Sequence, residues 1–233
     1  MDAKQRAGEK AVEFVEDGMN VGLGTGSTVY WTIMRLGSMV KQGLNIRAVP
    51  TSRRTEKLAR EQDITLVGFN EIEELDLTID GADEINPSLD LTKGGGGALL
   101  REKLVAAASK RLIIVADESK RVAALGRFPL PVEVVPFAWQ VTARRLAEDL
   151  SCTPTLRLDA AEQPYVTDNG NYILDCACGE INDPASLHRA LKLLAGVIET
   201  GLFIGMADIA IIASESGVEV IKAEQNIPRI EER

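Results

Sequence analysis

The chain has 233 residues, of which 45% are hydrophobic and 26% are charged, and its formal net charge is −9. This length and composition allow a sizeable core, in one large domain or in a main domain with a smaller one. The negative charge argues against a nucleic-acid binder, which needs a basic face, but not against a site for a small anion. One histidine and three cysteines without C-x-x-C spacing provide no zinc site, so reduced cysteines are the simplest interpretation.

The amino-terminal half alternates between helix and strand patterns. Its first segment is charged and amphipathic, without the apolar core of a signal peptide, and the longest apolar tract, 202–213, is too short to span a bilayer. We therefore expect a cytoplasmic protein without a membrane partner. The predicted strands are 20–23, 46–50, 64–69, 76–79 and 111–117, and the predicted helices are 3–17, 29–41, 51–62 and 98–109. This order predicts a parallel α/β sheet with right-handed crossovers.

The composition changes near residues 128–137, where three prolines fit a domain boundary or a change of sheet. Beyond it we expect a small α+β unit, made of a helix at 138–150, a strand at 154–158, a hairpin at 165–174, a helix at 184–195 and a strand at 197–203. The strand-like segment 208–221 is expected to return to the main sheet. The predicted division is a main domain of residues 1–128 and 204–233 and a small domain of residues 129–203.

Ligands of open parallel sheets bind beyond the carboxyl ends of the strands. Four polar segments are expected at that edge: 24–28, 51–54, 80–84 and 117–120. Their coincidence is a stronger indication of a site than any single motif.

The segment GLGTGST, residues 22–28, departs from the nucleotide-binding motifs. The dinucleotide fingerprint needs a glycine where Ser27 stands, and the P-loop needs a Gly-Lys-Ser/Thr run that is absent. What remains is a tight turn with three hydroxyls, Thr25, Ser27 and Thr28, at a helix N-terminus, which suits a single phosphate. A well-capped helix after a tight turn explains the same residues equally well.

Residues 76–103 bring together acids, a cation and glycines. A strand ends at Asp80, Asp83 and Glu84, and Lys93 then precedes four glycines that open the next helix. Consecutive glycines are costly in conformational entropy, and they indicate a close approach of the backbone or N–H groups that point into a cavity. These are the groups needed to move protons on a small anionic substrate.

Each of these residues also has a structural alternative. The two aspartates could act in acid–base chemistry, bind a divalent metal, or form a solvated turn. Lys93 and Lys120 could be exposed loop lysines, and His188 is expected to be an ordinary histidine. Glu102 flanks an apolar face that we assign to Leu100, Leu104 and Ala107, so periodicity does not decide whether it is exposed.

The motifs GLGTGST, DGADEI, KGGGGALLREK, FPLPVEV and VTDNGNYILD together resemble ribose-5-phosphate isomerase of the A type, over nearly the whole chain. The resemblance implies a Rossmann-like, mostly parallel sheet domain with a smaller α+β, ferredoxin-like domain. It also implies interconversion of ribose 5-phosphate and ribulose 5-phosphate through an enediolate, without a metal or organic cofactor. The expected partner is the phosphosugar, and the expected assembly is a homodimer or homotetramer.

The resemblance also implies the roles of individual residues. The catalytic set carried over from the family is Glu102, Asp80, Asp83 and Lys93. The substrate-binding set adds Thr25, Gly26, Ser27, Thr28, Gly81, Ala82, Gly94, Gly95, Gly96 and Lys120. Alternatives from other classes are a coenzyme A transferase, a phosphosugar deaminase, or a sugar-phosphate sensor domain. The sensor would need a basic helix-turn-helix, and none precedes residue 20.

Overall fold

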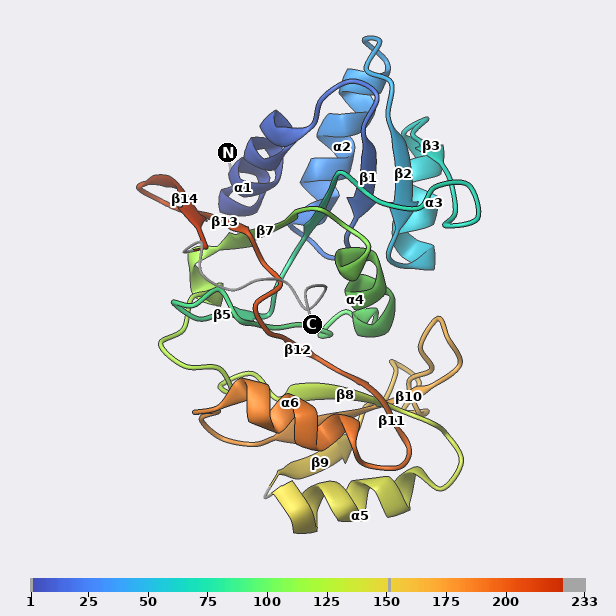
Figure 1. Ribbon diagram of the computed structural model, residues 1–233, viewed down its shortest axis with the longest axis vertical. Coiled ribbons are helices and arrows are strands. Elements are labelled where there is room, and N and C mark those ends of the chain that lie inside the picture. Colours follow the sequence, from blue (N-terminus) through green and yellow to red (C-terminus); the bar gives the residue numbers. More distant parts are fainter. Residues whose placement is uncertain (1, 151, 224–233) are drawn as a thin grey trace. The chain divides into compact units, whose positions relative to one another are not determined.

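The computed structural model describes residues 2–150 and 152–223 and divides into two compact units (Figure 1). The first unit comprises Met1–Ala82, Arg101–Arg121 and Gly205–Arg233, and the second comprises Asp83–Leu100 and Val122–Ile204. Residues 1, 151 and 224–233, which the predicted domain ranges include, lie outside the described residues.

A seven-stranded sheet with the order β14-β13-β7-β4-β1-β2-β3 forms the centre of the first unit. Its strands are β1 (Asn20–Leu23), β2 (Arg47–Pro50), β3 (Thr65–Leu66), β4 (Leu77–Asp80), β7 (Leu112–Asp117), β13 (Ile209–Ser214) and β14 (Gly217–Lys222). All neighbours are parallel except β13 and β14. The predicted parallel sheet is confirmed, and the carboxyl-terminal segment returns to it as a hairpin.

Helices cover both faces of this sheet. They are α1 (Ala3–Ala11), which continues as the 3-10 turn η1 (Val12–Phe14), then α2 (Val29–Val40), α3 (Arg53–Glu61) and α4 (Leu99–Ala107). Leu77 and Ile79 pack into one core cluster with residues of α1, α2 and α3. Thr78 points to the opposite face, where its hydroxyl lies 2.7 Å from that of Ser109. The strict alternation along β4 is the consequence of the strand's two-residue period.

The second unit contains a four-stranded antiparallel sheet with the order β11-β8-β10-β9. Its elements in chain order are β8 (Leu130–Val134), α5 (Trp139–Leu150), β9 (Thr153–Leu156), β10 (Tyr172–Ala177), α6 (Pro184–Lys192) and β11 (Val197–Thr200). Leu146 of α5 and Leu191 of α6 pack in one cluster with the sheet residues Val132 and Leu174. The β-α-β-β-α-β order is the ferredoxin-like arrangement expected for the small domain.

The observed units differ from the predicted division in residues 83–100, 122–128 and 204. Three short strands, β5 (Glu84–Ile85), β6 (Leu91–Thr92) and β12 (Leu202–Phe203), pair into a small antiparallel sheet of the second unit. Val122 adds to it by donating its N–H to Ile85 O at 3.0 Å. Two-residue strands carry no periodic signal, so this sheet could not be read from the sequence. The proline-rich segment 128–137 contains β8, which belongs to the four-stranded sheet rather than to the main sheet.

The predicted hairpin at 165–174 is only partly correct. The turn exists, because Thr167 donates its N–H to Asn171 O at 2.8 Å. However, β10 pairs with β9 and β8 rather than with residues 165–167. One reason is Glu133 on β8, whose Oε1 accepts hydrogen bonds from the side chains of Thr167 and Asn171, both at 2.9 Å. These bonds hold the turn against the sheet.

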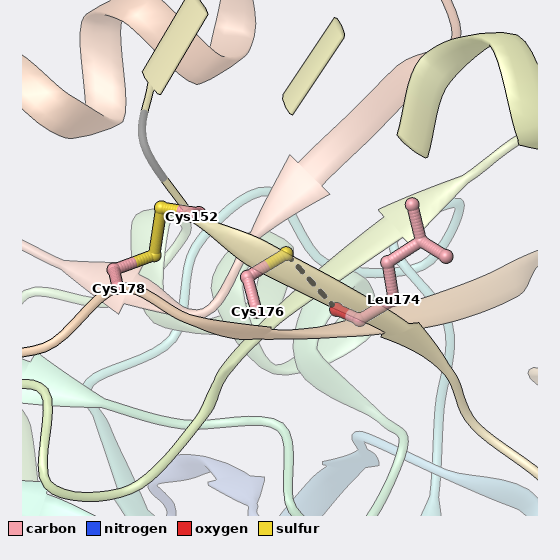
Figure 2. The surroundings of a disulfide bond; sticks show 4 residues. All are labelled: Cys152, Leu174, Cys176 and Cys178. Carbon is pink, nitrogen blue, oxygen red and sulfur yellow. Dashed lines mark hydrogen bonds between the residues drawn. A yellow bond between two sulfur atoms is a disulfide. The ribbon is translucent and has the colours of Figure 1, made fainter. Parts of the chain in front are cut away.

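The expectation of three reduced cysteines is wrong for two of them. Cys152 and Cys178, which flank β9 and β10, form a disulfide across a sequence separation of 26 (Figure 2). Cys176 is free and buried, and its thiol donates to Leu174 O at 3.7 Å. Burial, together with the nearby charge of Asp175, raises the pKa of Cys176 to about 12. This thiol is therefore protonated at neutral pH.

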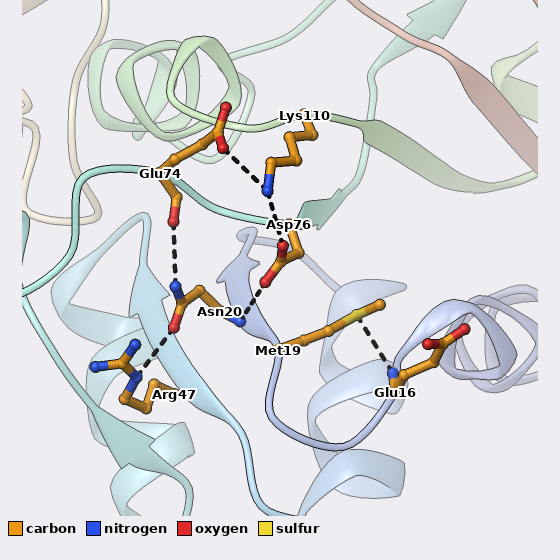
Figure 3. A network of polar contacts seen from close by, with 7 residues as sticks. All are labelled: Glu16, Met19, Asn20, Arg47, Glu74, Asp76 and Lys110. Atoms are coloured by element: carbon orange, nitrogen blue, oxygen red, sulfur yellow. Dashed lines mark hydrogen bonds and ion pairs between the residues drawn. The ribbon is translucent and has the colours of Figure 1, made fainter.

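A network of hydrogen bonds links the residues at the amino ends of β1, β2 and β4 (Figure 3). The Asp76 carboxylate accepts from Asn20 N at 2.9 Å and from Lys110 Nζ at 3.2 Å, while Asn20 Oδ1 accepts from Arg47 Nε at 3.0 Å. The bonds from Asn20 and Lys110 lower the pKa of Asp76, with the Asn20 bond as the largest cause. The amino edge of the sheet is thus occupied by structural contacts.

No helix within residues 2–150 and 152–223 has the length and hydropathy of a transmembrane segment.

Candidate active site

The carboxyl edge of the main sheet carries the polar segments predicted for it. The loops after β1, β2, β4 and β7 all leave this edge, because these strands are parallel neighbours. The chain builds β2 and β3 on one side of β1 and then crosses to β4 on the other side. In parallel α/β sheets such a switch point is where ligands bind.

Asp80 ends β4 at this switch point and is fully buried. Its Oδ1 accepts from the backbone N–H of Thr25 at 3.0 Å and from that of Gly81 at 2.8 Å. A Cβ added at Gly24 would lie 2.1 Å from the same oxygen, so only glycine permits this approach. The alternative of a solvated turn is therefore wrong for Asp80, whose carboxylate holds the predicted substrate loop.

The substrate loop itself is joined to a cluster of hydroxyls. Thr25 Oγ1 lies 2.8 Å from Thr51 Oγ1, 2.8 Å from Ser52 Oγ and 3.1 Å from Thr55 Oγ1. Ser52 caps α3 by accepting from Thr55 N, as predicted for residue 51 or 52. Thr55 was missed, although hydroxyl residues one turn apart at a helix start were a usable signal.

The rest of the loop leads into α2. Thr28 occupies the N-cap position of α2 without a side-chain capping bond, so helix capping does not explain its hydroxyl. Gly26 and Ser27 are exposed, and Gly26 has φ +134, a conformation that favours glycine. The first N–H groups of a helix have no partner within it and attract anions. The loop 25–28 thus offers donors of the kind that a phosphate needs.

In the second unit, Asp83 is bound by the glycine loop. Its Oδ2 accepts the N–H of Gly95 at 2.7 Å, and its own N–H donates to Thr92 O at 2.8 Å. A Cβ at Gly95 would lie 2.6 Å from Asp83 Oδ1. Gly95 and Gly96 are exposed, whereas Gly94 and Gly97 are buried. The loop therefore presents its middle to solvent while one of its N–H groups holds a carboxylate.

Lys93 is buried, with only 2% of its surface exposed, so the alternative of an exposed loop lysine is wrong. The N–H of Lys93 donates to Gly201 O at 2.8 Å, which fixes the backbone at the end of β6. Its ammonium lies 5.3 Å from the centre of the Phe203 ring, within the range of a cation–π contact. Burial of a lysine is costly, which indicates that its position matters.

Glu102 lies in the first turn of α4 and is 4% exposed. It shares the buried stripe of the helix with Leu99 and Val105, three residues away on either side, whereas Leu104 is 59% exposed. The predicted apolar face was therefore wrong. The glutamate occupies a position on the buried face where an apolar residue is the usual choice.

Glu84 has a structural role. It is buried, and its carboxylate accepts from Thr92 Oγ1 at 2.9 Å, from Gly126 N at 2.9 Å and from Phe128 N at 2.8 Å. These bonds tie β5 to β6 and to the segment before β8.

The remaining candidates have simpler surroundings. Lys120 is half-buried in the 3-10 turn η2 (Glu118–Lys120) after β7, and Ala82 is half-buried after β4. His188 Nδ1 is hydrogen-bonded to Thr200 Oγ1 at 2.7 Å, as expected for an ordinary histidine. The described residues contain no cluster of three or more metal-ligating side chains.

The chain is thus a two-unit α/β protein. One unit has a carboxylate at the switch point of a parallel sheet, and the other has a glycine loop next to a buried lysine, groups of the kind that acid–base enzymes use on small anions. The family model of ribose 5-phosphate isomerase A (phosphoriboisomerase A) matches residues 47–217. The chain belongs to this family, as its motifs predicted.

Individual relatives agree with the family match. A ribose-5-phosphate isomerase A of Bacillus cereus is 57% identical over 220 residues, which cover 94% of this chain and 99% of the relative. The solved ribose 5-phosphate isomerase of Plasmodium falciparum has a TM-score of 0.92 and 37% identity, over 96% of this chain and 99% of that one. A solved D-ribose-5-phosphate isomerase in complex with phospho-erythronic acid has a TM-score of 0.91 and 37% identity, over 95% of this chain and 100% of that one.

Proposed function

We propose that this chain interconverts ribose 5-phosphate and ribulose 5-phosphate with Glu102 as the base, assisted by Asp80, Asp83 and Lys93. Membership of the ribose 5-phosphate isomerase A family supports the proposed reaction. The observation that supports the base is the burial of Glu102 on the buried stripe of α4, where an apolar residue is the usual choice. Coenzyme A transfer, deamination and sugar sensing are set aside, because the relatives above are isomerases.

The chemistry needs one group that carries a proton between C2 and C1. A carboxylate can remove the proton from C2 and return it to C1 on the same face of an enediolate. Glu102 is fixed in a helix rather than in a loop, so its carboxylate is held in one place. This rigidity suits a group that must reach two neighbouring carbons in turn.

The oxygens of the enediolate need separate groups. Lys93 offsets their negative charge, with help from N–H groups of Gly94 and Gly96, while the N–H of Gly95 holds Asp83. Asp80 and Asp83 assist ring opening and move protons between O1 and O2. The burial of Lys93 supports this role, since charge stabilisation is strongest where water is excluded.

The phosphorylated sugar is bound by the residues around the catalytic groups. Thr25, Gly26, Ser27 and Thr28 at the start of α2, with Lys120, are suited to an anion. The backbone of Gly81 and Ala82 completes the proposed set. A relative in the family has been solved in complex with phospho-erythronic acid, a phosphorylated sugar acid. This complex supports a site in this chain that binds an anion. Further proposed properties are activity without a metal or organic cofactor, and a homodimer or homotetramer located in the cytoplasm.

Formation of ribulose 5-phosphate from ribose 5-phosphate tests the proposal. The wild-type chain should convert ribose 5-phosphate readily and unphosphorylated ribose very poorly, because remote phosphate contacts position the reacting carbons. Glu102→Gln keeps size and hydrogen bonding but removes basicity, and should slow turnover by roughly 10²–10⁴-fold. Comparable efficiency on ribose, or wild-type turnover by Glu102→Gln, would refute the corresponding role.

A further inference from the structure

We propose that Arg157 and Tyr165 are positioning residues of this isomerase, because they hold the glycine loop 94–97 in the conformation that the reaction uses. The inference rests on the proposed roles of Lys93 and Asp83, which border and contact that loop. Both positioning residues belong to the second unit. Neither is among the predicted catalytic or substrate-binding residues, and neither was singled out from the sequence.

Arg157 follows β9 and binds two carbonyls of the loop. Its Nη1 donates to Gly94 O at 2.8 Å and to Gly95 O at 3.3 Å. Its Nε donates to Asp175 Oδ2 at 2.9 Å, and its Nη2 donates to Asp175 Oδ1. This two-point pairing with a carboxylate on β10 fixes the plane of the guanidinium and leaves Nη1 directed at the loop.

The peptide between Gly94 and Gly95 connects this contact to Asp83. The carbonyl of Gly94 and the N–H of Gly95 belong to the same trans peptide unit, so they point in opposite directions. Arg157 binds the carbonyl, and Asp83 Oδ2 accepts from the N–H at 2.7 Å. The peptide is thus fixed at both ends. Because glycines have no side chains to restrain them, an external contact of this kind is what holds their orientation.

Tyr165 supports the other end of the loop. A Cβ built at Gly97, whose φ is +78, would lie 2.2 Å from Tyr165 Oη, so the phenol packs directly on the glycine backbone. The guanidinium carbon of Arg157 lies 5.9 Å from the centre of the Tyr165 ring, and Tyr165 N donates to Arg157 O at 2.9 Å. Burial, with the charge of Asp168 next, raises the pKa of the Tyr165 phenol, so the hydroxyl at Gly97 is neutral.

The segment that carries Tyr165 is itself held in place. The turn beginning at Thr167 is bound to the fully buried carboxylate of Glu133 on β8, through Thr167 Oγ1 and Asn171 Nδ2. Both positioning residues therefore rest on strands of the antiparallel sheet. A loop held from rigid elements can keep Lys93 and the Gly95 N–H within the small tolerance that catalysis demands.

Variants of Arg157 test the inference. Arg157→Met should lower kcat by about 10- to 100-fold, the size expected from a small displacement of catalytic groups. KM should change by less than about threefold, because the variant leaves the proposed phosphate-binding loop intact. Arg157→Lys should recover part of kcat, since an amine keeps the charge and one donor but not the planar fork. Arg145→Met, at an exposed position on α5, is the matched control and should leave kcat unchanged.

Hydrogen exchange of the backbone amides supplies a readout that a general loss of stability would not reproduce. Amides of residues 95–97 should exchange faster in Arg157→Met, while amides in the strands of the main sheet should not. Tyr165→Ala should show the same two effects, whereas Tyr165→Phe should keep most of kcat because the ring remains. If Arg157→Met does not fold, the Tyr165 pair decides the question by itself.

Two results would overturn the inference: a folded Arg157→Met with kcat within about twofold of the wild type, or a lower kcat without faster exchange in residues 95–97. Lys93→Met separates this inference from the proposed function. If Lys93→Met is fully active, the role of Lys93 is wrong whatever Arg157 does. If Lys93→Met is inactive and Arg157→Met is active, only the positioning role is wrong.

Discussion

Two buried glutamates of this fold, Glu84 and Glu102, are assigned different roles. Glu84 accepts three hydrogen bonds, one from β6 and two from the segment before β8, so its carboxylate has a complete structural explanation. Glu102 occupies a position on α4 that packing alone would give to an apolar residue. We therefore expect different effects when each glutamate is changed to glutamine: a loss of stability for Glu84 and a loss of turnover for Glu102.

Glu84→Gln should reduce stability rather than chemistry. Replacing one acceptor oxygen by an amide weakens a hydrogen bond to a charged group, at a cost of about 1–3 kcal/mol in the free energy of unfolding. Turnover per folded molecule should stay within about threefold of the wild type. Urea unfolding and kcat measured on the same preparation check this, with exposed Glu180→Gln as the control. Unchanged stability with a large loss of kcat would show that Glu84 acts in the reaction.

The lowered pKa of Asp76 leads us to expect that the stability of the fold depends on pH. The Asp76 carboxyl has a lowered pKa in the fold, so its contribution is fully present above the ordinary value of 3.8 and is lost as the pH falls through the lower folded pKa. At pH 7, Asp76→Asn should cost about 1 kcal/mol of unfolding free energy, because the contacts to Asn20 N and Lys110 are partly exposed.

The same variant should lose less stability than the wild type between pH 4 and the acid transition, where wild-type Asp76 becomes protonated. Denaturant unfolding across this range measures the difference, and Asp149→Asn on the exposed face of α5 serves as the control. A constant gap between Asp76→Asn and the wild type down to the lowest pH would contradict the assignment.

At the scale of elements, the sequence predicted what depends on periodicity. The apolar runs of β1, β2, β4 and β7 and the capped start of α3 were found close to their observed bounds. The two-residue strands β5, β6 and β12 were not, because their pairing depends on distant segments rather than on their own pattern. For α4, the buried stripe contains a glutamate, Glu102, between Leu99 and Val105. Because a charged residue is not expected in an apolar stripe, the prediction placed the buried face at Leu100, Leu104 and Ala107 instead.

The candidate site shows the same division. Asp80, Asp83, Lys93 and Glu102 became candidates because acids, a lysine and glycines stand close together in sequence, and their proposed roles came from the resemblance to the family. Arg157 and Tyr165 were not identified, because their contacts to the glycine loop join residues about 60–70 positions apart, a separation that local pattern rules do not reach. The disulfide was missed for a related reason, since three cysteines at irregular spacing do not specify a pair.

The disulfide gives a prediction at this scale. In the native, non-reduced protein, alkylation should label none of the cysteines, because two are joined and Cys176 is a buried thiol with a pKa of about 12. Unfolding without a reductant should expose one thiol, and unfolding with a reductant should expose three. Reduction should also lower the free energy of unfolding by about 2–4 kcal/mol. Labelling of all three cysteines without a reductant would contradict the Cys152–Cys178 pair.

At the scale of the whole molecule, the family's reaction is proposed to run on protein groups alone. Dialysis against a strong chelator should therefore leave kcat and KM unchanged, because Lys93 and backbone N–H groups supply the charge stabilisation that a cation could otherwise provide. A loss of activity that magnesium or manganese specifically restores would instead assign Asp80 and Asp83 to a metal.

Glu102 is proposed to carry the proton between C2 and C1 of the sugar. Exchange of the C2 hydrogen of ribose 5-phosphate in deuterated water, followed by NMR with wild type and Glu102→Gln, measures this step apart from product formation. We expect exchange with the wild type and a loss of roughly 10²–10⁴-fold in the rate of exchange with Glu102→Gln. The thermal stability of the variant should remain close to that of the wild type. Exchange by a folded Glu102→Gln at close to the wild-type rate would contradict the claim and leave Asp80 or Asp83 as the base.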